Sequence, residues 1–108
     1  MIKSSLKGIV IMIKKQKINA EKLYKAVLKL ESIEECVAFF EDICTFQEIE
    51  AMTQRLEVAI QLCNEKSYTE INKLTGASTA TICRVSKALN YGDGGYMTVI
   101  ERLENDDI

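Results

Sequence analysis

Three hydroxyl residues in the middle of the chain are each followed, three positions later, by a glutamate. The pairs are Ser32 with Glu35, Thr45 with Glu48, and Ser67 with Glu70. In this spacing the hydroxyl accepts a hydrogen bond from the glutamate backbone, and the carboxylate accepts one from the backbone of the hydroxyl residue. These bonds satisfy amides that the start of a helix leaves free. We therefore expect helices to begin next to residues 32, 45 and 67.

The composition agrees with a helical chain. The 108 residues include no proline, and only 6% are aromatic, which disfavours a sheet of many strands. Apolar residues recur at helical spacing in three stretches: Leu23, Val27 and Leu30; Cys36, Phe39, Phe40 and Ile43; and Ile49, Met52, Leu56, Ile60 and Cys63. We predict an all-α fold in which each stripe belongs to the core or to a seam between two copies of the chain. A chain of this length has a small core, which favours a dimer.

Charge is distributed unevenly along the chain. Residues 1–30 carry eight lysines and one glutamate, and residues 31–65 carry nine acids and one arginine. Residues 66–90 carry four cations and one acid, and residues 91–108 carry five acids and one arginine. The net charge of -2 therefore conceals a basic stretch at residues 66–90, which can bind phosphate groups on an acidic protein.

Residues 1–18 are expected to form a basic N-terminal arm, and residues 19–108 a single helical domain. Within the arm, residues 9–13 favour a strand whereas the neighbouring lysines favour solvent, and disorder is the alternative. The apolar run at residues 8–13 is too short for a membrane span or a signal-peptide core, so we expect a cytoplasmic protein with no membrane partner. Met12 is a second candidate for the translation start, which an N-terminal peptide mass would test.

The cysteines do not predict a metal site or a disulfide. They are Cys36, Cys44, Cys63 and Cys83, without a close pair, and the chain has no histidine. Most of them fall at apolar helical positions, where a free thiol packs as a small core side chain. A glycine-rich phosphate loop and a nucleophile with a recognisable base are also missing. We therefore expect neither an enzyme nor a bound cofactor.

Residues 68–90 have the layout of a helix-turn-helix. A short helix over residues 68–74 ends before Gly76, which can adopt positive φ, and Ser78 can cap a longer helix that reaches about Asn90. The predicted internal core consists of Ile71, Ala77, Ile82 and Val85. Three glycines in residues 91–95 then turn the chain into a last amphipathic helix.

The second helix of this unit begins with small residues, which allow close approach to base edges in the major groove. The hydroxyls of Ser78, Thr79 and Thr81 can bond phosphates or bases, and Ala80 can contact a thymine methyl. Arg84 and Lys87 supply positive charge. An ordinary helical hairpin with a serine cap is the alternative interpretation of the same pattern.

Three segments resemble the Trp-repressor superfamily, and within it the YerC/YecD group of Trp-repressor-related proteins: MTQRLEVA at residues 52–59, TGASTATICR at residues 75–84, and LNYG at residues 89–92. The resemblance covers about residues 21–103. It implies a six-helix chain that interlaces with a second copy in an intertwined homodimer. Two helix-turn-helix heads, roughly 34–36 Å apart, would then enter successive major grooves of a near-palindromic operator in double-stranded DNA.

The resemblance also implies roles for individual residues. Thr79, Ala80, Thr81 and Cys83 match groove-facing positions, and Asn72 and Lys73 match positions near phosphate contacts. The expected DNA-binding set is Asn72, Lys73, Ser78, Thr79, Ala80, Thr81, Cys83, Arg84 and Lys87.

A small-molecule effector pocket is a further implication, because Thr45, Arg55 and Arg84 match effector-contacting positions and two arginines can hold a carboxylate. Val85 stands where the family's tryptophan sensor has glycine, and Ala88 replaces a serine. Steric room and a polar contact are thereby lost, so a smaller effector, or none, fits better than tryptophan. For Arg55 the alternative is a structural ion pair with an acid of residues 31–65.

These observations predict a sequence-specific DNA-binding transcription regulator, and a repressor where its operator overlaps a promoter. The alternative is a helical dimer that binds another protein, with acidic residues 31–65 as the contact surface and the helix-turn-helix retained for packing.

Overall fold

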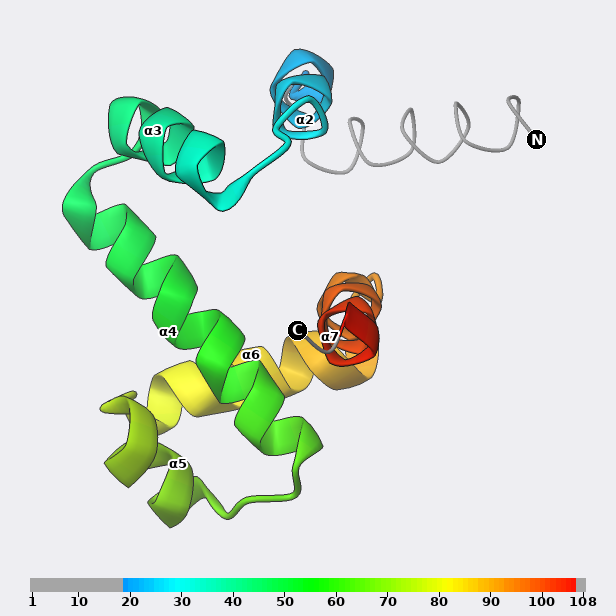
Figure 1. Cartoon of the computed structure of the whole chain (residues 1–108). Coiled ribbons are helices and arrows are strands. Elements are labelled where there is room, and N and C mark those ends of the chain that lie inside the picture. The colour runs from blue at the N-terminus through cyan, green and yellow to red at the C-terminus, as the bar shows by residue number, and fades with distance from the viewer. Residues whose placement is uncertain (1–18, 107–108) are drawn as a thin grey trace. The chain divides into compact units, whose positions relative to one another are not determined.

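A computed structural model describes residues 19–106 of the chain (Figure 1). Six helices and no strand occur in this range: α2 (Glu21–Val27), α3 (Ile33–Ile43), α4 (Phe46–Cys63), α5 (Tyr68–Thr75), α6 (Thr79–Tyr91) and α7 (Gly95–Asp106). The predicted all-α fold is confirmed. The predicted basic arm at residues 1–18, with Met12, lies outside the described residues.

Two helices start with the predicted reciprocal caps. At α4 the hydroxyl of Thr45 accepts from the Glu48 amide at 3.1 Å, and the Glu48 carboxylate accepts from the Thr45 amide at 2.7 Å. At α5 the corresponding Ser67 and Glu70 distances are 3.2 and 3.0 Å. Both helix starts are therefore encoded locally.

The start of α3 differs in one contact. The Ser32 hydroxyl accepts from the Glu35 amide at 3.1 Å, as predicted. The Glu35 carboxylate accepts instead from the amide of Glu31, one residue before the cap, at 2.8 Å. The helix still begins at Ile33, since either amide precedes the first turn and lacks a partner within the helix.

The chain divides into two compact units at residue 44, and residues 44–106 form one of them. In this unit α4 packs against α5 and α6, α5 packs against α6, and α7 contacts α4 and α6 (Figure 1). The core residues are each at most 3% exposed: Val58, Ala59, Ile71, Ala77, Ile82, Val85 and Ile100. All four residues predicted as the internal core of the helix-turn-helix are buried here, so that prediction is confirmed.

The predicted apolar stripe of α4 did not identify its most buried residues. Val58 and Ala59 are fully buried, whereas the stripe members Met52 and Cys63 are exposed. Val58 and Ala59 belong to the core cluster that includes residues of α5, α6 and α7, whereas the stripe members Leu56 and Ile60 pack against this cluster and are only partly buried.

Residues 19–43 of the other unit contain α2 and α3, neither of which has a buried residue. The rings of Phe39 and Phe40 contact each other edge to face, with centroids 5.5 Å apart, and both side chains are half-buried. Leu28 and Ile33 are 82% and 79% exposed. Residues 19–43 by themselves therefore leave apolar surface on these helices uncovered.

The prediction that most cysteines pack as core side chains is wrong for a single copy of the chain. All four are free thiols; Cys36 and Cys44 are half-buried, and Cys63 and Cys83 are exposed. The thiol of Cys63 lies 3.6 Å from the sulfur of Met97 on α7. Among residues 19–106, no group of three cysteine, aspartate or glutamate side chains is arranged to hold a metal ion, and no helix is long and apolar enough to cross a bilayer.

Candidate nucleic-acid interface

The turn between α5 and α6 depends on a left-handed glycine. Gly76 has φ of 74° and ψ of 2°, and its amide donates to the Asn72 carbonyl at 2.8 Å. Ser78 then caps α6 by accepting from the Thr81 amide at 3.2 Å. A side chain at Gly76 would meet no atom closer than 4.0 Å, where the amide nitrogen of Gln54 lies. The turn therefore selects glycine for its conformation rather than for space.

Side-chain hydrogen bonds hold the same turn. The Asn72 amide donates to the Ala77 carbonyl at 2.7 Å, and the Gln54 amide donates to the Thr75 carbonyl at 3.1 Å. The Thr75 hydroxyl donates to the Ile71 carbonyl at 2.7 Å and accepts from the Ala77 amide at 3.1 Å. Sequence reasoning placed Asn72 near phosphates and did not identify Gln54 or Thr75.

Helix α6 has two distinct faces. Ile82 and Val85 are buried, and Leu89 packs against the same core. The opposite face carries exposed residues that recur at helical spacing: Thr79, Ala80, Cys83, Arg84 and Lys87. We call these five residues the α6 stripe. Five of the predicted DNA-binding residues therefore share one solvent-facing surface.

Ser78 and Thr81 lie beside the α6 stripe and bond each other. Ser78 is exposed, and its hydroxyl donates to the hydroxyl of the half-buried Thr81 at 3.2 Å. Both hydroxyls thus have a partner within the cap. Thr79 presents the hydroxyl of the first turn that the cap does not use.

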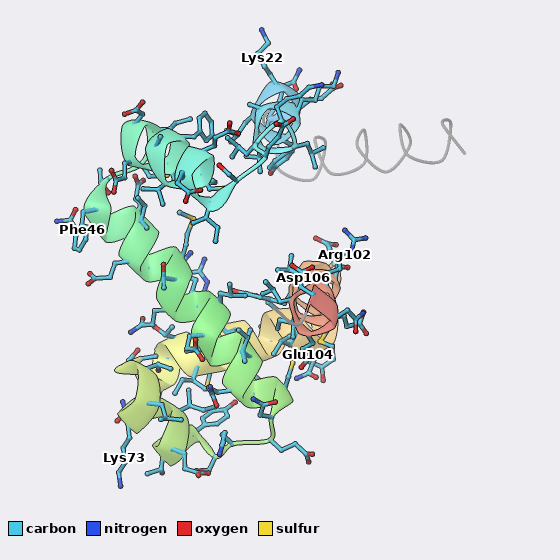
Figure 2. All side chains as sticks on the ribbon, in the orientation of Figure 1. Lys22, Phe46, Lys73, Arg102, Glu104 and Asp106 are labelled. Atoms are coloured by element: carbon cyan, nitrogen blue, oxygen red, sulfur yellow. The ribbon has the colours of Figure 1, made fainter. Side chains whose placement is uncertain are left out.

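The cations of this surface are available. Arg84 and Lys87 make no hydrogen bond or ion pair with any residue in the described part of the chain, and both are exposed. Lys73 on α5 also extends into solvent (Figure 2). Unpaired cations on an exposed face bind phosphates without first breaking an internal ion pair.

The single acid of residues 66–90 is held at a helix start. Hydrogen bonds from the backbone amide and the hydroxyl of Ser67 lower the pKa of Glu70, and the positive charge of Lys66 lowers it further. The carboxylate thus stays ionised at the positive end of α5. The Glu70 carboxylate therefore caps α5 and is not part of the α6 stripe.

Among the predicted effector residues, the groove that Arg55 lines includes neither Thr45 nor Arg84. The Thr45 hydroxyl caps α4, and Arg84 is exposed on α6. Arg55 is half-buried and lines a groove of about 400 Å³ with Cys44, Gln47, Glu48, Ala51 and Met52. Within one copy, Arg55 makes no ion pair with the acids of residues 31–65, all of which are described, so the alternative of a structural ion pair stays a prediction.

Comparison with known proteins identifies one family. The family described as Trp repressor protein matches residues 19–104. The uncharacterized protein YerC of Bacillus subtilis (strain 168) is 45% identical over 84 residues, which cover 78% of this chain and 81% of that protein. A crystal structure of a TrpR like protein from Eubacterium eligens superposes with a TM-score of 0.78 and 47% identity, over 86% of this chain and 94% of that one. A solved structure from Staphylococcus aureus gives a TM-score of 0.80 and 41% identity, over 85% of this chain and 93% of that one. The chain therefore belongs to the Trp repressor family.

Proposed function

We propose that the protein is a sequence-specific DNA-binding transcription regulator that reads an operator with α6. The observation that carries the proposal is the α6 stripe, a solvent-facing row of small residues followed by two unpaired cations on a helix whose opposite face is buried. When small residues precede cations along one helix face, the first turn of the helix can reach base edges while the cations reach the neighbouring phosphates.

The contacts divide into two kinds. Thr79, Ala80 and Cys83 are the residues that read bases, through a hydroxyl and apolar contacts in the major groove. Arg84 and Lys87 bind phosphates, and Lys73 and Asn72 add phosphate contacts from α5. Ser78 and Thr81 fix the first turn of α6 by their mutual hydrogen bond and offer their remaining lone pairs and donors to DNA.

The active form is a homodimer in this proposal. Several apolar side chains on or next to α2 and α3 are left uncovered by residues 19–43: Leu28 is 82% exposed, Ile33 is 79% exposed, and Val37 and Ile43 are about half exposed. Exposed apolar area of this extent favours association. A symmetric dimer presents two copies of α6, which predicts a near-palindromic operator with half-sites one helical turn apart. Repression follows where such an operator overlaps a promoter.

Arg55 has no ion-pair partner among the described residues and therefore favours a small acid as the effector. Thr45 and Arg84, supplied from the two chains of a dimer, would contact the same acid. Tryptophan is disfavoured, because Val85 is only 2% exposed and occupies core space with its side chain. DNA binding that requires no effector is the alternative.

Affinity selection on random duplex DNA tests the proposed function. Wild-type protein is expected to enrich a near-palindromic sequence, and Lys87→Ala is expected to bind the enriched duplex more weakly. Lys22→Ala is the matched control, since it removes an equal charge from an exposed position on α2 (Figure 2). Recovery of no common sequence, or equal effects of the two substitutions, would contradict the proposal.

A protein-binding role is the second candidate, and one groove favours it. About 640 Å³ in volume, this groove lies between α4 and the end of α5 and contains Phe46 and Leu74, which are 74% and 62% exposed. Glu50 and Glu57 also line it. Co-purification of one defined protein that is lost in Phe46→Ser, together with a flat response to DNA, would favour this role over DNA binding.

A further inference from the structure

The hydrogen bond from Gln54 connects two parts of the fold that are separate in sequence. Gln54 lies on α4, outside the helix-turn-helix, and its side chain is half-buried. Its amide nitrogen donates to the carbonyl of Thr75, 21 residues later, at 3.1 Å. The same nitrogen is the atom nearest to the empty side-chain position of Gly76, at 4.0 Å. The amide of Gln54 therefore lies against the turn that redirects the chain into α6.

The carbonyl that it binds belongs to the last residue of α5. Carbonyl groups in the last turn of a helix have no partner within the helix and must find one elsewhere. Gln54 supplies that partner for Thr75, and the Asn72 amide supplies one for Ala77 at 2.7 Å. Side-chain amides thus hold the carbonyl groups on both sides of the left-handed Gly76.

Only residues 76–78 separate α5 from α6, so the conformation of Gly76 sets the direction in which α6 leaves the turn. A small rotation at this point would displace the whole α6 stripe relative to the major groove of bound DNA. Contacts to base edges depend on position within tenths of an ångström, whereas long cationic side chains adjust to reach phosphates.

We propose that Gln54 is a positioning residue for DNA reading, which orients α6 through the carbonyl of Thr75 without contacting DNA. The inference rests on the proposed function, since it concerns how the α6 stripe is oriented toward DNA. Gln54 determines the preference for one sequence over another more than it determines the affinity for DNA in general.

The test compares Gln54→Met with Gln47→Met. Both changes remove an amide from α4 at similar volume and equal charge, but Gln47 makes no hydrogen bond with any residue in the range 19–106. Fluorescence anisotropy would measure the dissociation constants for a duplex enriched by the wild-type protein and for a scrambled duplex. Circular dichroism would fix a temperature at which every variant is fully folded.

If the orientation of α6 loses the stabilisation of this one part-buried hydrogen bond, Gln54→Met should bind the enriched duplex up to about tenfold more weakly. Its affinity for the scrambled duplex should change by less than about twofold, because phosphate contacts dominate that binding. Gln47→Met should match the wild type on both duplexes. The informative quantity is the ratio of the two affinities, which a general loss of stability would not lower.

Each other outcome overturns a different claim. If the wild type does not distinguish the duplexes, the proposed function fails and this inference fails with it. If the wild type distinguishes them and Gln54→Met does so equally well, or loses affinity equally for both, the positioning role alone is refuted. Gln54→Glu, controlled by Gln47→Glu, repeats the test without the amide donor and decides it if Gln54→Met does not fold.

Discussion

The left-handed Gly76 allows a quantitative prediction. Alanine at this position would keep φ near 74° without a steric clash, because the nearest atom lies 4.0 Å from the new side chain. The remaining cost is conformational, about 1–2 kcal/mol for a residue with a side chain in the left-handed region. Reduced freedom of the unfolded chain offsets about 0.5–1 kcal/mol of it. Gly76→Ala is therefore expected to lower the free energy of unfolding by roughly 0.5–1 kcal/mol, the middle of the range that the two terms give.

Thermal unfolding followed by circular dichroism, at one fixed protomer concentration, measures this change. A loss of 1 kcal/mol corresponds to a Tm lower by about 4–8 °C for a domain of this size. Gly76→Asn should lose about half as much, since asparagine tolerates the left-handed region better than alanine.

Gly94 is a natural control, because its φ is 83° and nothing lies within 4 Å of its empty side-chain position. Gly94→Ala should lower the Tm to a similar extent but leave DNA affinity unchanged, since Gly94 lies outside the helix-turn-helix. A Tm of Gly76→Ala within about 1 °C of the wild type would refute the reasoning, because the strain estimate predicts a larger shift.

Three further predictions concern the core, the phosphate contacts and the α5 cap. Ile82 is fully buried, so Ile82→Ala should lower the free energy of unfolding by about 2–5 kcal/mol in a urea titration. Leu74→Ala, at a 62% exposed site, should change it little, and equal losses would contradict the observed packing. Lys87→Ala should reduce the slope of log affinity against log salt concentration by about 1 per protomer, and an unchanged slope would mean that Lys87 binds no phosphate. Because the folded state lowers the pKa of Glu70, the carboxylate stabilises the fold above the ordinary pKa of a glutamate, and this stabilisation is lost as the pH falls through the lowered value. Glu70→Gln should therefore flatten the acid side of the curve of Tm against pH, and a curve that keeps its shape would exclude the proposed cap effect.

Local chemistry explains which parts of the fold were predictable. The caps at Thr45 and Ser67 and the glycine turn at Gly76 involve residues within four positions of each other, so their spacing is visible in the sequence. Helix α5 accordingly ends at Thr75, one residue beyond its expected limit, and α6 ends at Tyr91, one residue beyond Asn90.

Features that depend on distant partners were missed for a physical reason. The bond from Gln54 to Thr75 spans 21 residues, and nothing in the local pattern distinguishes Gln54 from Gln47. Val58 and Ala59 are buried because three other helices cover that part of α4. The stripes of α2 and α3 could not be assigned to a core or to a seam, since the cover for such surfaces can come from a second chain.

The same distinction applies to the interface. Residues of the α6 stripe were predicted from the small side chains that start the helix, from the charges after them and from the family resemblance, and the structure places them together on an exposed surface. Their roles toward DNA stay predictions. Asn72 shows why roles are harder to predict than positions, since its amide already spans the turn to Ala77 while a second amide hydrogen stays available for a phosphate.

Half-site spacing is the most direct measure of the central claim, that two copies of α6 read one operator. The dissociation constant would be measured for the enriched duplex and for versions in which about 5 or about 10 base pairs are inserted between the half-sites, that is, half a turn or a full turn of DNA. A rigid dimer predicts a loss of at least about 100-fold for the half-turn insertion, which approaches non-specific affinity, because the second α6 then meets the wrong side of the duplex. Equal affinity for the original duplex and for the half-turn insertion would contradict the claim.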